Sequence, residues 1–143
     1  MAYEFKAIRR VEFSDTDMAG IMHYSNFFRF METAEHGFFR SLGFSIIGEV
    51  GWPRVRAQCD FRAPLRFEDE VEIHLLVTEK KSKALSYDFI FRRLVPTPET
   101  EVANGSMTVV CVTHQDGKMT ACPIPPSIAN KIEVAPAKLH RHG

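Results

Sequence analysis

One apolar stripe constrains the fold of this 143-residue chain more than any other feature. Between residues 27 and 42, apolar side chains recur at spacings of three and four: Phe27, Phe30, Met31, Ala34, Phe38 and Leu42. This period predicts one long amphipathic helix, with Ser25 or Asn26 as its N-cap and Gly43 as its C-terminal stop. The polar residues of this segment lie largely off the stripe: Arg29, Glu32, Glu35, His36 and Arg40.

Alternation of apolar and polar residues predicts strands over 3–13, 53–62, 70–79, 84–94 and 101–114. Short turns join the last four segments, which indicates an antiparallel sheet. The striped helix must bury its apolar side against that sheet. We therefore expect an α+β fold in which a curved sheet wraps around one long helix. A single helix leaves much of the other sheet face uncovered, so we expect the chain to dimerise through its sheet.

Composition narrows the class of protein. The length suits one domain over 1–143, with an extended and partly frayed tail over about 124–143, where prolines are frequent. The 18 acidic and 18 basic residues balance, which gives no argument for a nucleic-acid partner. No apolar run could span a bilayer, and the first residues lack a secretory core, so we predict a cytoplasmic protein without a membrane partner. Cys59, Cys111 and Cys122 are too widely spaced for a disulfide framework or a zinc site.

The segment 13–26 concentrates the chemistry, with Asp15 and Asp17 between a strand and the helix. A calcium loop would need a glutamate where Asn26 stands. A phosphotransferase with this Asp-x-Asp pattern would need further carboxylates and a lysine on a parallel sheet. Asp15 is expected to pin the loop by bonding backbone amides. Asp17 either does the same or places a carboxylate beside the helix N-terminus, whose amides can polarise a thioester carbonyl.

The segment from Ile8 to Gly43 resembles the 4-hydroxybenzoyl-CoA thioesterase branch of the hotdog superfamily. The shared residues are Val11-Glu12-Phe13, Asp15-Thr16-Asp17, Ala19-Gly20-Ile21, Tyr24 and Asn26. With a weaker likeness over 53–95, the resemblance covers about two thirds of the chain. It implies a hotdog fold, with five antiparallel strands around the long helix. It also implies an enzyme that hydrolyses acyl- or aroyl-CoA to the free acid and CoA, as a homodimer or homotetramer with active sites between subunits.

The resemblance implies roles for particular residues. Asp17 would be the nucleophile or general base, the Tyr24 amide would polarise the carbonyl, and Gly20 would let the loop approach closely. Substrate contacts would fall on Glu32, Pro53, Arg54, Lys81, Ser82 and Lys83. Glu32 stands where the aryl-CoA enzymes have an aspartate, and the two lysines stand where they have arginines for the CoA phosphates. No metal is implied, and no cofactor beyond the CoA of the substrate.

His23 departs from the pattern of a related branch of the superfamily. That branch has tyrosine followed by histidine at this place, whereas this chain has His23 followed by Tyr24. We keep His23 as a candidate substrate-binding residue without the helper role that the branch assigns. Two other functions stay open: a hotdog hydratase or dehydratase, and a non-catalytic acyl-CoA-binding module. The acyl group itself is not predicted.

Overall fold

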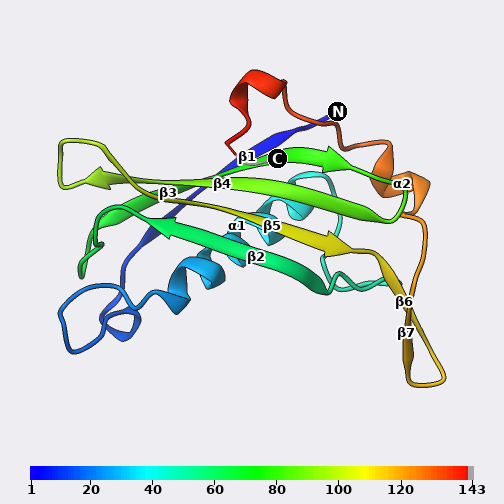
Figure 1. Cartoon of the computed structure of the whole chain (residues 1–143), viewed down its shortest axis with the longest axis horizontal. Coiled ribbons are helices and arrows are strands. Elements are labelled where there is room, and N and C mark those ends of the chain that lie inside the picture. The colour runs from blue at the N-terminus through cyan, green and yellow to red at the C-terminus, as the bar shows by residue number, and fades with distance from the viewer. Residues whose placement is uncertain (142–143) are drawn as a thin grey trace.

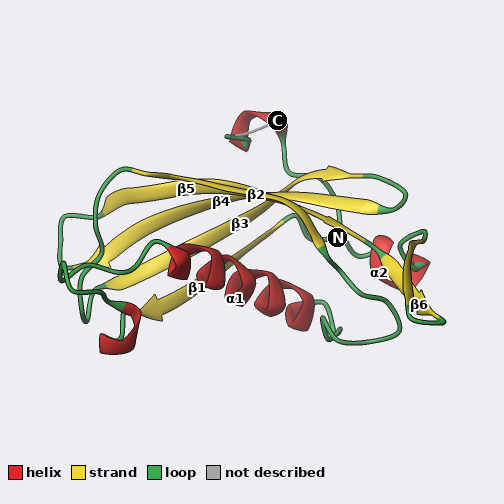
Figure 2. Cartoon of the chain, turned by 60° about the horizontal axis from the view of Figure 1, so that its bottom comes forward, coloured by secondary structure: helices red, strands yellow, loops and turns green. Residues whose placement is uncertain are grey.

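The computed structural model describes residues 1–141 and contains one long helix against one five-stranded sheet. The helix α1 spans Ser25–Ser41. The strands are β1 (Glu4–Arg10), β2 (Arg54–Phe61), β3 (Glu70–Lys80), β4 (Ala84–Val95) and β5 (Thr100–Val110). The strand order is β1-β3-β4-β5-β2, and every neighbouring pair is antiparallel. The predicted hotdog architecture is confirmed, with the sheet curved over α1 (Figure 2).

The core forms where the helix stripe meets one face of the sheet. Phe30, Met31, Ala34 and Phe38 are at most 1% exposed. The sheet covers them with alternate residues of its two central strands, because successive side chains of a strand point to opposite faces. These sheet residues are Val71, Ile73, Leu75, Val77, Leu85, Tyr87, Phe89 and Phe91.

Two local predictions about α1 were wrong. The N-cap position is Tyr24, with helical φ and ψ of −56° and −29° and no side-chain cap bond, instead of Ser25 or Asn26. The buried side of the helix is also wider than the stripe, because Glu35 and Phe39 are fully buried. Glu35 can be buried because it has a cationic partner on β2, described below.

The predicted strand over 101–114 is two strands. β5 ends at Val110, and Val112–Gln115 (β6) forms a separate hairpin with Lys118–Ala121 (β7). The chain leaves the sheet at Cys111, whose amide donates to the Lys83 carbonyl. Two 3-10 turns, η1 (Phe13–Asp15) and η2 (Ala137–Leu139), and a short helix α2 (Pro126–Ala129) complete the elements.

The segment after residue 124 differs from the extended, frayed tail that we expected. Ile124, Ile128, Ile132 and Ala135 are buried, and the Ala135 amide donates to the Val77 carbonyl at 2.7 Å. The described chain ends on the side of the sheet opposite α1 (Figure 2), where the Arg141 amide donates to the Asp88 carboxylate. The part of the fraying prediction that concerns residues 142–143 lies outside the described residues. None of the helices within residues 1–141 has the length and apolarity needed to cross a bilayer.

Candidate active site

Asp15 builds the loop between β1 and α1. Its carboxylate accepts the Glu12 amide at 2.8 Å, and its carbonyl accepts the His23 amide and the Asn26 side-chain amide at 2.9 and 2.8 Å. Asn26 therefore ties the first turn of the helix back to the loop. These bonds agree with the expectation that Asp15 pins the loop.

Asp17 lies at the start of a tight turn in the same loop. Its Oδ1 accepts the Ala19 amide at 2.9 Å, and its carbonyl accepts the Gly20 amide at 2.9 Å. Gly20 closes the turn with φ of +79°, a conformation that other L-residues rarely adopt. The turn leaves Asp17 half-buried and orients it towards the start of α1, where both line one cavity.

His23 occupies the position that a capping side chain would fill. Its Nδ1 accepts the Ser25 amide at 3.2 Å and lies 2.8 Å from the Ser25 hydroxyl. Because Nδ1 accepts a backbone N–H, the neutral ring carries its proton on Nε2. The His23 ring also stacks on Tyr24, with centroids 4.6 Å apart. The sequence prediction treated His23 as a substrate contact, and the bonds found here are to the helix start.

The amides at the start of α1 are only partly free. Those of Ser25, Asn26 and Phe27 bond to His23 Nδ1, the His23 carbonyl and the Tyr24 carbonyl. The Tyr24 amide has no hydrogen-bond acceptor among residues 1–141. It is therefore the donor that remains available at this helix terminus.

A cavity of about 430 Å³ brings the candidate residues together. Asp17 and Tyr24 line it with apolar side chains from three places: the loop, the first turn of α1, and the end of β2 with the residues that follow. The apolar lining residues are Ile21, Met22, Phe27, Phe61, Ala63 and Pro64. Arg62 is the only basic residue among those that line it, and it also pairs with Glu101 at 3.5 Å. The cavity therefore offers one carboxylate in a mainly apolar wall.

A second cavity, of about 390 Å³, lies beside the first turns of α1 and β2. Glu32 and Arg54 line it together with Ser25, Phe28, Arg29, Ala57 and Met107. Arg54 Nη2 lies 3.7 Å from Glu32 and 2.5 Å from Glu35. The structure thus brings together two predicted substrate contacts, Glu32 and Arg54, although on a different cavity from Asp17.

Glu35 was missed as a partner in the sequence analysis. Its side chain is fully buried, and burial raises the pKa of its carboxyl above the usual 4.5, while the Arg54 charge opposes that rise. The buried Tyr87 ring belongs to the same cluster, and burial together with the Glu35 charge raises the pKa of its hydroxyl. Arg54 also donates to the Trp52 carbonyl at 2.7 Å. Arg54 therefore has a structural role whether or not it meets a substrate.

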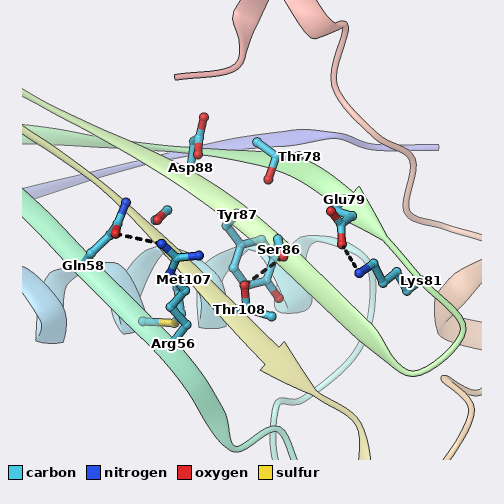
Figure 3. Close-up of a pocket in the computed structure, with 11 residues that line it drawn as sticks. Arg56, Gln58, Thr78, Glu79, Lys81, Ser86, Tyr87, Asp88, Met107 and Thr108 are labelled. Atoms are coloured by element: carbon cyan, nitrogen blue, oxygen red, sulfur yellow. Dashed lines mark hydrogen bonds and ion pairs between the residues drawn. The ribbon is translucent and has the colours of Figure 1, made fainter. Parts of the chain in front are cut away.

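The lysine turn lies far from Asp17 within one chain. Lys81, Ser82 and Lys83 are exposed and join β3 to β4, at the opposite end of the sheet from the Asp17 loop (Figure 1). β3 runs from Glu70, beside that loop, to Lys80, which is about 33 Å at 3.3 Å per residue. Lys81 pairs with Glu79 at 2.9 Å on the rim of a polar groove across the outer sheet face (Figure 3). Pro53 precedes β2, and its carbonyl accepts the Val110 amide.

No metal site stands out in the part of the chain that the structure describes. Residues 1–141 contain no group of three or more His, Cys, Asp or Glu side chains placed to hold an ion. The carboxylates of Asp15 and Asp17 instead accept backbone amides of their own loop.

Comparisons with known proteins identify the family and the fold. The family model described as "Thioesterase-like superfamily" matches residues 11–132. A putative esterase of Aquifex aeolicus is 35% identical over 119 residues, which are 80% of this chain and 88% of that protein. The solved structure of a gentisyl-coenzyme A thioesterase is 35% identical, with a TM-score of 0.76 over 86% of this chain and 98% of that one. The structure of 4-hydroxybenzoyl-CoA thioesterase from Pseudomonas sp. strain CBS-3 shares the fold, with a TM-score of 0.84, 21% identity, and coverage of 91% and 99%.

Proposed function

Because the chain belongs to the Thioesterase-like superfamily, we propose that it hydrolyses acyl-CoA or aroyl-CoA thioesters to the free acid and CoA. The observation that carries this proposal is the shared cavity of Asp17 and Tyr24. It combines a carboxylate, an available amide at a helix start and an apolar wall for an acyl or aryl group. The cytoplasmic location expected from the sequence is part of the same proposal.

In the proposed reaction the Tyr24 amide donates to the thioester oxygen and stabilises the negative charge that develops there. Asp17 then acts in one of two ways. As a nucleophile, its oxygen bonds to the acyl carbon, the C–S bond breaks, and water later cleaves the mixed anhydride. As a general base, it takes a proton from water while the hydroxide adds to the same carbon. In both cases CoA leaves as a thiolate and is protonated by solvent.

We propose that the working form is a homodimer paired along β2, or a homotetramer made of two such dimers. This strand is an edge of the sheet, and within residues 1–141 no strand pairs with its outer side. Val55 and Phe61 on it are 61% and 50% exposed. Two-fold antiparallel pairing of β2 with its copy brings the Arg54 end of the strand in one subunit to the Phe61 end in the other. The predicted substrate contacts of one subunit would then approach the Asp17 cavity of the other: Glu32, Pro53, Arg54, Lys81, Ser82 and Lys83.

Two matched variants test the role of Asp17 on a panel of acyl- and aroyl-CoA thioesters. Asp17→Asn keeps an oxygen for the Ala19 amide but removes the charge, so kcat/KM should fall by about 10²–10⁴. Asp15→Asn is the control, because it makes the same chemical change at a carboxylate that bonds the Glu12 amide and does not line the cavity. It should stay within a few-fold of wild type in activity.

The panel also separates the alternatives. Equal activity of wild type and Asp17→Asn would refute the catalytic assignment. Binding of acyl-CoA without hydrolysis of any thioester would support a non-catalytic module. A single turnover in oxygen-18 water tests the nucleophilic mechanism. Label in the Asp17 carboxylate would indicate the mixed anhydride, because general-base catalysis labels only the released acid.

A further inference from the structure

Two cysteines that are eleven residues apart meet at the base of the β6–β7 hairpin. Cys111 lies between β5 and β6, and Cys122 follows β7. Their sulfur atoms are 3.6 Å apart, and the Cys122 amide donates to the Cys111 carbonyl at 2.9 Å. Cys111 is fully buried, whereas Cys122 is half-buried. The hairpin therefore brings together two thiols whose sequence spacing suggests no relation.

The same two segments hold the lysine turn. The Cys111 amide donates to the Lys83 carbonyl at 2.8 Å, and the Ile124 amide donates to the Ser82 carbonyl at 2.8 Å. The turn is thus bonded to Cys111 itself and to Ile124, which lies two positions after Cys122. A covalent link between the cysteines would join both attachments of the turn.

We propose that Cys111 and Cys122 form a reversible disulfide that fixes the turn at residues 81–83. Residues facing each other across an antiparallel pair have Cα atoms about 4.5–5.5 Å apart, within the range of natural disulfides. Bond formation requires the sulfur atoms to close from 3.6 Å to about 2.05 Å. Rotation about the Cys122 side chain can supply part of this movement, because Cys122 is the less buried of the two.

A low-molecular-weight disulfide such as glutathione disulfide is the oxidant. The Cys122 thiolate attacks one sulfur of that disulfide and releases one glutathione thiolate, which takes up a proton. Cys111 then loses its proton to solvent and attacks the Cys122 sulfur of the mixed disulfide, which releases the second glutathione. Two protein thiols are oxidised and one glutathione disulfide is reduced to two thiols. Cys122 starts the exchange because it is the more exposed thiol, whereas Cys111 is fully buried and burial raises its pKa to about 12.

Cys59 provides an internal control. It lies on β2 of the five-stranded sheet, opposite Gly105, whereas the β6–β7 hairpin is a separate two-stranded sheet. Burial also raises the pKa of its thiol to about 12, which makes it a poor nucleophile at neutral pH. The disulfide is therefore expected to leave Cys59 reduced.

Thiol counting under denaturing conditions tests the bond itself. After incubation of the full chain with glutathione disulfide, the three free thiols of wild type should fall to one, and dithiothreitol should restore all three. Cys59→Ser should fall from two thiols to none, whereas Cys122→Ser should form no intramolecular disulfide. Peptide mapping should find the 111–122 link. Three remaining thiols in wild type, or a disulfide that contains Cys59, would overturn the proposal.

Hydrogen exchange tests the effect on the turn. Peptides that cover 81–83 and 111–124 should exchange at least severalfold more slowly in the oxidised than in the reduced protein. Cys122→Ser treated in the same way should show no such difference. Identical exchange in oxidised and reduced wild type would show that the bond does not fix the turn.

The consequence for catalysis rests on the proposed function, in which this turn meets the CoA phosphates. Oxidation should then change KM for a CoA thioester by twofold or more, with kcat preserved. KM for a pantetheine thioester, which lacks the nucleotide, should not change. If the disulfide forms and KM is unchanged for both substrates, the turn does not contact the nucleotide of CoA. Complete absence of thioester hydrolysis would instead refute the proposed function, without altering the thiol counts.

Discussion

Replacing Arg54 by methionine should cost more stability than neutralising its partner Glu35, although both changes break the same ion pair. The Glu35 side chain is 0% exposed, whereas the Arg54 side chain is 24% exposed. Arg54→Met leaves a carboxylate buried without its cation, which costs about 3–5 kcal/mol. Glu35→Gln leaves the guanidinium with an amide oxygen and partial contact with water, so we expect about 1–2 kcal/mol.

The losses in unfolding free energy caused by Arg54→Met and by Glu35→Gln should also depend on pH in opposite directions. Burial raises the pKa of Glu35 above 4.5, and the Arg54 charge opposes this rise. A carboxyl whose folded pKa is raised contributes stability that is full below its unfolded pKa and lost as pH rises through the folded value. Removing Arg54 raises the pKa further, so the cost of Arg54→Met grows with pH by up to about 1.4 kcal/mol per unit until the carboxyl is ionised. The cost of Glu35→Gln shrinks as pH rises through a lower window, between the unfolded pKa and the folded pKa of wild-type Glu35, because only the wild type carries the titrating group.

Urea unfolding at about pH 5 and pH 8 measures both effects. The variant with both substitutions completes a double-mutant cycle. It should be less destabilised than Arg54→Met alone at the higher pH, since Gln removes the unpaired charge. Equal costs for the two single substitutions, with no dependence on pH, would refute the view that the buried carboxylate dominates this cluster.

Three further predictions concern stability and are checked by urea or thermal unfolding. Gly20→Ala should cost about 1–2 kcal/mol for its left-handed backbone alone, since nothing lies within 4 Å of the added methyl group. Gly48→Ala, which also meets open space but without a positive φ, should change stability by less than about 0.5 kcal/mol. Gly105→Ala should cost about 3 kcal/mol, because the methyl group meets the Gln58 carbonyl on the neighbouring strand. Ile132→Ala should cost about 3 kcal/mol, whereas a frayed tail would show almost no change.

The helix and the strands could be predicted because their patterns are local. The stripe from Phe27 to Phe38 has the helical period, and Val71 to Val77 and Leu85 to Phe91 have the period of a strand. All these residues lie in the core between α1 and the sheet. The hotdog arrangement itself followed from the resemblance over the segment from Ile8 to Gly43, not from the periods alone.

The residues whose burial or role was predicted wrongly are mostly fixed by contacts between distant parts of the chain. A glutamate on a helix is usually exposed, whereas Glu35 is buried and paired with Arg54, which lies nineteen positions later at the start of β2. The prolines of the tail suggested an extended segment, but Ile124, Ile128 and Ile132 carried an apolar signal that the prediction passed over. His23 took the capping role through a bond to Ser25 that the residue types alone do not specify.

Residues of the candidate site could be proposed from the sequence, but the sequence could not place them relative to one another. Asp17 and the start of α1 are near in sequence, so a local argument could join them. The lysine turn is as far from Asp17 as the length of β3 allows, so one chain cannot present both to a substrate bound in that cavity. Antiparallel pairing of two copies reverses the direction of the second sheet, which brings the lysine-turn end of one copy to the Asp17 end of the other. The separation within one chain is therefore an argument for the proposed dimer, in which the partner along β2 would bring its lysine turn to the Asp17 cavity.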